Sequence, residues 1–290
     1  MNREIPLFNM PIGPGSQQDK DDLVLDYMPM PNDMASYHMP ILPEPEELET
    51  CPHTIALLEL LQDDLNHYQV GQPSIEHSLE AIPPVDLITL NQILGEGEVS
   101  AVILGSSGEK TQIQETVLAG VWRLRQFDSA GELIKDTLEV ADIPQCVHQT
   151  AFATAAPLVV GAVEIGADLL NAPSVLVELS DVSARMQESQ DKTPPHVINL
   201  SLLPFSSNDQ GFLAEQLGVG PVTILSRGYG NCRITSTASC LIWRVQYFNS
   251  TDQLILDTIE VSAMPQVACA AQEDIDDSAV RLSEIREVLV

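Results

Sequence analysis

Two stretches, 122–145 "WRLRQFDSAGELIKDTLEVADIPQ" and 243–266 "WRVQYFNSTDQLILDTIEVSAMPQ", are two copies of one segment. They align without a gap and share W-R, F, S, L-I, D-T, E-V and P-Q. Self-similarity of this kind within one chain indicates a duplicated structural unit. The duplication therefore decides the architecture of the body of the chain.

Each copy predicts an antiparallel β-hairpin, because strand-forming residues flank the turn sequences "DSAG" and "NSTD". Asp136 and Asp257 lie on the apolar side of the return strands, where a carboxylate needs a partner. Arg123 and Arg244 on the neighbouring strands are the candidate partners, and structural ion pairs are expected. A catalytic pair of acids is the less favoured interpretation, because no nucleophile or second base accompanies them.

The match extends backwards to two glycine turns, "LGEGEV" at 94–99 and "LGVGPV" at 217–222. Helical patterns precede both turns, so each unit predicts a helix, a short loop, a helix, a G-x-G turn and then several strands. A helix is also expected for the C-terminal "DIDDSAVRLSEIREVL". The predicted fold class is α+β: two tandem duplicated units in a pseudo-twofold arrangement, each with helices packed on an antiparallel β-sheet.

Three regions follow from composition and from the repeat. Residues 1–50 are acidic and rich in Pro and Met, and they predict a flexible tail. The first α+β repeat is expected at 51–152. The second is expected at 153–290, together with the C-terminal helix.

The glycine turns do not predict a nucleotide site. A dinucleotide fingerprint runs strand, glycine loop, helix, whereas here the order is helix, turn, strand. Glu96 and Glu98 would also repel phosphate. The first glycine of each turn is better explained as a helix C-cap.

Charge and composition exclude several classes of protein. The net charge is -29, from 13 Lys+Arg against 42 Asp+Glu, which disfavours binding to nucleic acid or anionic membranes. No apolar run approaches the ~20 residues of a membrane span, and the first residues do not resemble a signal peptide. The five scattered cysteines form no disulfide or zinc pattern, and no catalytic motif is present. A cytoplasmic protein without cofactor, metal or catalytic residues is expected.

Several motifs, in order, resemble the HupH/HyaF family of hydrogenase expression/formation proteins. They are "LGEGEVS", "RGYGNCRI", "WRVQYFNS", "IEVSAMPQV" and "AAQEDIDDSAVRLSEI". The resemblance covers roughly residues 52–290. It implies an accessory protein rather than an enzyme: a chaperone for the [NiFe]-hydrogenase small-subunit precursor, the Fe–S chain exported with a twin-arginine signal peptide. Other hydrogenase accessory proteins are possible further partners.

The two units diverge at loops, where "SRGYGNCRITST" (226–237) stands against "GSSGEKTQIQET" (105–116). Loop drift explains this divergence as well as function does. If it is functional, Glu96 and Glu98 are the candidates for contact with a basic segment of the partner. Arg227, Tyr229 and Cys232 are the candidates for a second contact surface.

Three other classes of function stay open at this point. An Fe–S or metal carrier in the same maturation pathway would use Cys232, Cys240 and Cys269 with a histidine. An enzyme would need a convergent pocket that the sequence does not show. A scaffold would bridge several maturation factors through the two similar faces of the repeat.

Overall fold

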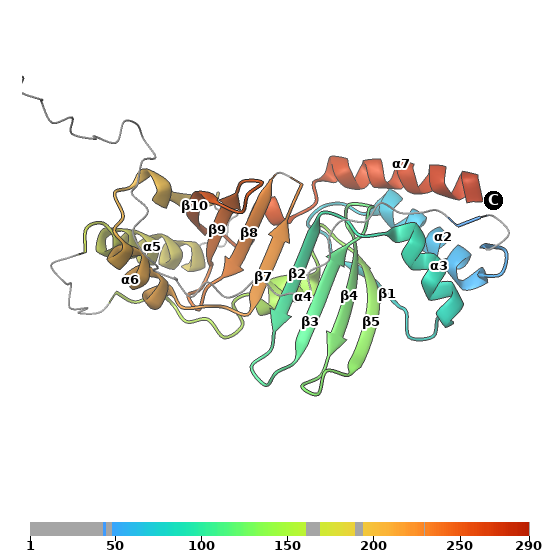
Figure 1. Cartoon of the computed structure of the whole chain (residues 1–290), viewed down its shortest axis with the longest axis horizontal. Helices are drawn as coiled ribbons and strands as arrows, with labels where there is room; N and C mark the ends of the chain where they lie inside the picture. Colours follow the sequence, from blue (N-terminus) through green and yellow to red (C-terminus); the bar gives the residue numbers. More distant parts are fainter. Residues whose placement is uncertain (1–42, 45–47, 161–168, 189–193, 229, 290) are drawn as a thin grey trace, which may run out of the picture. The chain divides into compact units, whose positions relative to one another are not determined.

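The computed structural model describes residues 43–44, 48–160, 169–188, 194–228 and 230–289. The chain divides into two units, residues 1–34 and 35–290, and all described residues belong to the second. Nearly all of the predicted flexible tail at 1–50 lies outside the described residues. The elements of the second unit are labelled in Figure 1.

A ten-stranded antiparallel sheet forms the centre of this unit, in the order β1-β5-β4-β3-β2-β7-β8-β9-β10-β6. The first repeat supplies the five strands from β1 to β5, and the second supplies the five from β6 to β10. The strands are β1 (Ile75–Ser78), β2 (Val99–Leu104), β3 (Lys110–Glu115), β4 (Val121–Phe127), β5 (Leu133–Val140), β6 (His196–Asn199), β7 (Val222–Ser226), β8 (Asn231–Ser236), β9 (Ile242–Phe248) and β10 (Leu254–Val261).

Helices flank both halves of the sheet. They are α2 (Pro52–His67), α3 (Pro84–Leu94), α4 (Gln145–Thr150), α5 (Ala172–Glu188), α6 (Ser207–Leu217) and α7 (Gln272–Leu289), with the short 3-10 helices η1 (Leu200–Leu202) and η2 (Gln266–Ala268). The α+β class and the C-terminal helix are therefore confirmed. The pseudo-twofold relation of the two units stays a prediction.

The prediction that only a short loop joins the two helices of each unit was wrong in one respect. It contains an edge strand, β1 in the first unit and β6 in the second, which pairs with β5 or β10 respectively. Each edge strand has only four residues. Four residues are too few for an alternating pattern to be distinguished from loop sequence.

The predicted ion pairs are confirmed in both repeats. Arg123 donates to Asp136 from Nε at 3.0 Å and from Nη2 at 2.7 Å. Arg244 donates to Asp257 in the same way, at 3.1 and 2.6 Å. Both aspartates are buried, so this two-point hydrogen bonding compensates the loss of hydration of their carboxylates.

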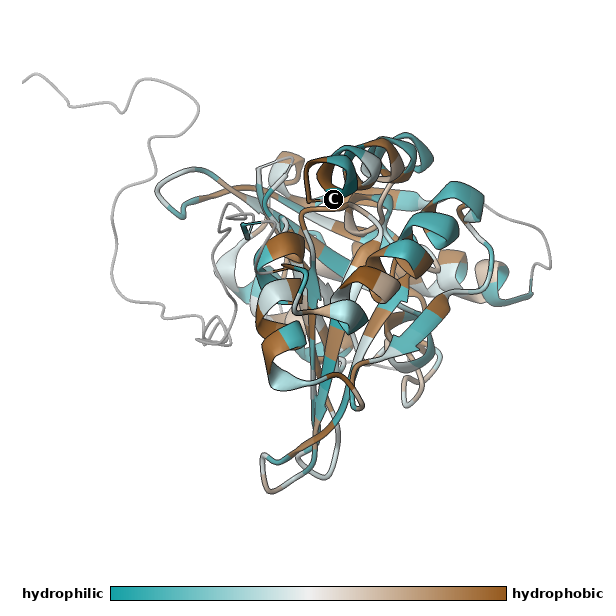
Figure 2. Ribbon diagram, turned by 90° about the vertical axis from the view of Figure 1, so that its right-hand side faces the viewer, coloured by the Kyte–Doolittle hydropathy of each residue, from teal (hydrophilic) through white to brown (hydrophobic). Residues whose placement is uncertain are grey.

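Apolar helix faces pack against the sheet to form the core. Leu58, Leu61 and Leu65 of α2 are buried with the first repeat's strands, and their spacing places them on one face of the helix. A second cluster joins α5 and α6 to β9 and β10. Figure 2 shows helices that carry hydrophobic residues on one side and hydrophilic residues on the other.

The two repeats exchange their C-terminal segments. After α4, Phe152 packs edge-on against Trp243 of the second repeat, with ring centroids 5.0 Å apart. After β10, the chain returns to the first repeat, where α7 packs on α2. Ala270 N–H donates to Asp142 O at 2.9 Å on the way. Each repeat is therefore followed by a segment that packs against the other repeat.

The glycine turns have the predicted C-cap role. Gly95 ends α3 with φ +53, and its N–H donates to Asn91 O at 2.9 Å. Gly218 ends α6 with φ +64, and its N–H donates to Ala214 O at 3.0 Å. In this left-handed region a side chain would be strained, which accounts for glycine in both copies.

The ion pairs generate a stability prediction. Asp257→Ala leaves the Arg244 guanidinium without its carboxylate on a buried strand, so the free energy of unfolding should fall by about 2–4 kcal/mol. Asp181→Ala removes an exposed i,i+4 pair with Arg185 and should cost about 0.5 kcal/mol or less. Urea denaturation of both variants measures the difference. Equal losses would mean that the buried pair contributes no more than a surface pair.

Candidate functional site

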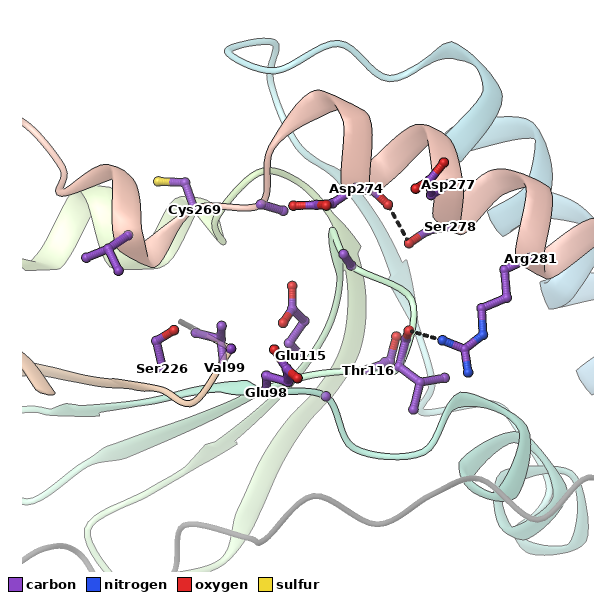
Figure 3. Close-up of a pocket in the computed structure, with 16 residues that line it drawn as sticks. Glu98, Val99, Glu115, Thr116, Ser226, Cys269, Asp274, Asp277, Ser278 and Arg281 are labelled. Carbon is purple, nitrogen blue, oxygen red and sulfur yellow. Dashed lines mark hydrogen bonds between the residues drawn. The ribbon is translucent and has the colours of Figure 1, made fainter. Parts of the chain in front are cut away.

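A cavity of about 510 Å³ lies where the two repeats and α7 meet. Its walls come from the glycine turn before β2, the end of β3 and the loop after it, the end of β7, η2 and the first half of α7. Figure 3 shows this arrangement. The lining residues are Gly97, Glu98, Val99, Glu115, Thr116, Val117, Ala119, Ser226, Gly228, Val267, Cys269, Ala270, Asp274, Asp277, Ser278 and Arg281.

The pairing of β2 with β7 brings the two loops of the cavity rim together. Val99 lies opposite Ser226 in the register, and Arg227 N–H donates to Glu98 O at 3.0 Å. Glycines permit the close approach. A Cβ on Gly97 would lie 2.2 Å from Thr116 O, and one on Gly228 would lie 2.2 Å from a carboxylate oxygen of Glu98.

Glu115, the last residue of β3, is the buried acid of the cavity and is only 7 % exposed. Burial raises the pKa of its carboxyl to about 7; the charges of Glu98 and Asp274 add to the rise, while the backbone N–H groups of Gly120 and Val99 oppose it. The Gly120 bond is long, at 3.4 Å. No cation of the described residues forms a salt bridge with this carboxylate.

Helix α7 contributes charged side chains to the opposite wall. Asp274 and Asp277 of α7 line the cavity, whose other side carries Glu98 and Glu115 (Figure 3). Arg281 is the basic residue of the described lining, and its Nη1 donates to Val117 O at 3.3 Å. The described lining as a whole therefore carries four carboxyl groups and one guanidinium, which donates to a backbone carbonyl.

The structure brings together only some of the residues predicted from sequence. Glu98 is exposed and lines the cavity, and Arg227 is exposed beside it. Glu96 is half-buried in the same turn but does not line the cavity, and its Oε2 is buried without a hydrogen-bond partner. Tyr229 lies outside the described residues. Cys232 is 2 % exposed on β8, so its side chain is not at the surface.

The cysteines give little support to a metal or Fe–S site. Burial raises the pKa of the Cys232 thiol to about 11 and that of Cys269 to about 12. Cys240 donates instead to Ala155 O at 3.5 Å. Within the described residues, no group of three or more His, Cys, Asp or Glu side chains is placed to hold a metal ion. Nor is any described helix long and apolar enough to span a membrane.

Sequence reasoning missed Glu115, Asp274, Asp277 and Arg281 as cavity residues. A signal for Glu115 exists in the repeat, because 105–116 aligns with 226–237 and places Ser236 against Glu115. The residues that follow make the same hydrogen bond in both repeats: Thr116 Oγ1 donates to Leu118 O, and Thr237 Oγ1 donates to Ser239 O. The residues on α7 have no such signal, because their position depends on how the helix crosses to the first repeat.

Comparison with known proteins gives consistent matches. The family described as "HupH hydrogenase expression protein, C-terminal conserved region" matches residues 53–156 and 169–289. Hydrogenase expression/formation protein HupQ of Azotobacter chroococcum mcd 1 is 58% identical over 277 residues, covering 96% of this chain and 95% of that one. HoxQ of Azotobacter vinelandii is 52% identical over 289 residues, covering both chains completely.

More distant relatives also match. Hydrogenase-1 operon protein HyaF of Escherichia coli K12 is 32% identical over 286 residues, covering 94% of each chain. Among solved structures, hydrogenase expression protein HupH from Thiobacillus denitrificans is 23% identical, with a TM-score of 0.37, and covers 40% of this chain and 95% of that one.

The glycine rim generates a second prediction. Gly97→Ala places a methyl group against the Thr116 carbonyl, so the free energy of unfolding should fall by about 1–3 kcal/mol. Gly211→Ala is the control, because its Cβ would meet no atom within 4 Å and α6 would gain about 0.5–1 kcal/mol. Thermal and urea unfolding report both changes. A Gly97→Ala protein as stable as the unaltered chain would show that the rim has more room than the structure gives it.

A third prediction concerns pH. The raised pKa means that folded Glu115 holds its proton more tightly than unfolded Glu115 does, so its contribution to stability is complete below about pH 4.5 and is lost as pH rises to about 7. Glu115→Gln should remove this dependence. The stability difference between the two proteins should change by about 2–3 kcal/mol over that interval. Parallel pH profiles would contradict the raised pKa.

Proposed function

The chain belongs to the HupH hydrogenase expression protein family, and we propose that it is a maturation chaperone for an uptake [NiFe]-hydrogenase. Its relatives are named as hydrogenase expression or formation proteins, which supports a role in hydrogenase maturation. In the proposal, the chain is not an enzyme and acts in the cytoplasm. It binds the Fe–S small-subunit precursor before export, through the twin-arginine signal peptide, the subunit, or both.

The carboxylate-lined cavity is the observation that carries the binding proposal. It joins an exposed acid, Glu98, to a buried acid, Glu115, beneath two further acids on α7. Complementary charge accelerates encounter with a basic segment and selects its orientation. The net charge of -29 extends this attraction beyond the cavity itself.

The proposal includes the pseudo-twofold arrangement of the repeats. The sheet order supports it. From one edge to the middle of the sheet the strands are β1, β5, β4, β3 and β2, and from the other edge they are β6, β10, β9, β8 and β7, which are the corresponding strands of the second repeat. The junction of β2 with β7 would then be the axis. A partner bound at the cavity beside this junction would contact both repeats at once.

Charge reversal tests the acidic rim. The double variant Glu96→Lys, Glu98→Lys should weaken association with the small-subunit precursor by about tenfold at low salt, and the difference should shrink at high salt. The double variant Glu109→Lys, Glu132→Lys, at two exposed hairpin turns, is the control for the same change in net charge. Surface plasmon resonance with immobilised precursor measures all three. Unchanged association at low salt would remove the glutamates from the interface.

A pull-down distinguishes the parts of the precursor. Purified protein is used as bait for the small-subunit precursor with and without its leader, and iron is assayed in the bait. If an iron-free bait captures the precursor only when the leader is present, the result supports a signal-peptide chaperone. Capture without the leader moves the contact to the subunit. No capture, with iron in the bait, would overturn the chaperone proposal in favour of a carrier.

A further inference from the structure

The second repeat folds without a carboxyl group at the position that corresponds to Glu115. At the corresponding place in the second unit, Ser236 Oγ accepts from Val222 N–H at 3.0 Å and donates to Val222 O at 3.4 Å. The hydroxyl thus satisfies the local backbone with no charge. In the first unit, the same position carries a carboxyl group that is buried against a cavity and forms no salt bridge with any described residue.

A buried carboxylate without a counter-ion costs free energy, and the protein lowers this cost by holding a proton on it. The cost disappears when a cation occupies the space in front of the carboxylate. That space exists here, because the side chain of Glu115 points into the cavity between the sheet and α7 (Figure 3). Its volume, about 510 Å³, falls in the range of small-ligand sites, about 300–1,000 Å³.

The other charged groups around the cavity define the kind of cation. Glu98 lies on the strand side, and Asp274 and Asp277 lie on α7, while Arg281 is held by Val117 O. The acids are spread along the walls, and no three of the described acidic, His or Cys residues converge as ligands for a metal ion. An elongated organic cation with several N–H donors fits such walls better than a single metal ion does.

We propose that this cavity receives one arginine or lysine side chain of a partner polypeptide, with Glu115 as its counter-ion. The inference rests on the proposed function for the identity of the partner, the small-subunit precursor. The cationic head reaches Glu115, and Glu98 at the exposed rim contacts the stem or the neighbouring backbone. Because Glu115 is half protonated near pH 7, entry of the cation displaces a proton and binding tightens as pH rises.

The direct test uses a small probe on the full chain. N-acetyl-arginine amide is titrated into labelled protein, and the amide signals of Gly120 and Gly97 are followed by NMR. N-acetyl-citrulline amide, which has nearly the same shape without the charge, is the control ligand. Saturable shifts are expected with the arginine probe only. Equal shifts with both probes, or none with either, would overturn the inference.

Two variants at Glu115 keep the test specific. Glu115→Gln retains the shape, and Glu115→Ser copies the residue that the second repeat tolerates, so both are expected to fold. Each should weaken binding of the arginine probe by about tenfold or more, whereas Glu132→Gln should leave it unchanged. For the unaltered protein, the dissociation constant should fall about tenfold between pH 6 and pH 8 as Glu115 ionises. Both Glu115 variants should lack that dependence.

The probe and the precursor separate the two proposals. If the arginine probe fails to bind while the precursor is still captured through Glu98, the cavity inference is wrong and the proposed function stands. If the probe binds through Glu115 but the precursor is not captured, the cavity inference stands and the partner is wrong. Loss of precursor capture in Glu115→Gln and Glu115→Ser, with capture retained in Glu132→Gln, supports both.

Discussion

The antiparallel pairing of β2 with β7 is the constraint on which the rest of the structure depends. It joins two five-stranded halves into one sheet and sets Val99 opposite Ser226. This register places the glycine turn of the first repeat against the loop that follows β7. Without it, Glu98 and the 226–228 loop would lie on separate sheets, and the cavity would have no second wall.

The exchange of C-terminal segments completes what the pairing begins. Helix α7 belongs to the second repeat by sequence but packs on α2 of the first, with Ile275 against Gly120. This crossing places Asp274 and Asp277 above Glu115. The same connection that packs α7 on the first repeat therefore supplies the third wall of the cavity.

The repeat made much of the fold predictable from sequence. The hairpins, the Arg–Asp pairs and the glycine C-caps each follow from local chemistry that occurs twice, so each copy supports the interpretation of the other. The edge strands β1 and β6 were missed because four residues carry too little pattern. Of the predicted contact residues, Glu98 lines the cavity and Arg227 lies beside it. The α7 acids were missed, because their position depends on a crossing between repeats. Cys232 was proposed as a contact residue because it belongs to a divergent loop motif. In the structure it occupies a buried position of β8.

The account places partner binding at the junction of the two repeats. Hydrogen–deuterium exchange of the full chain, with and without the hydrogenase small-subunit precursor, tests this most directly. The account predicts slower exchange at 97–99, 115–120 and 226–228 and along the first half of α7 when the precursor is present. Protection confined to α5 and α6, with exchange at the junction unchanged, would contradict it.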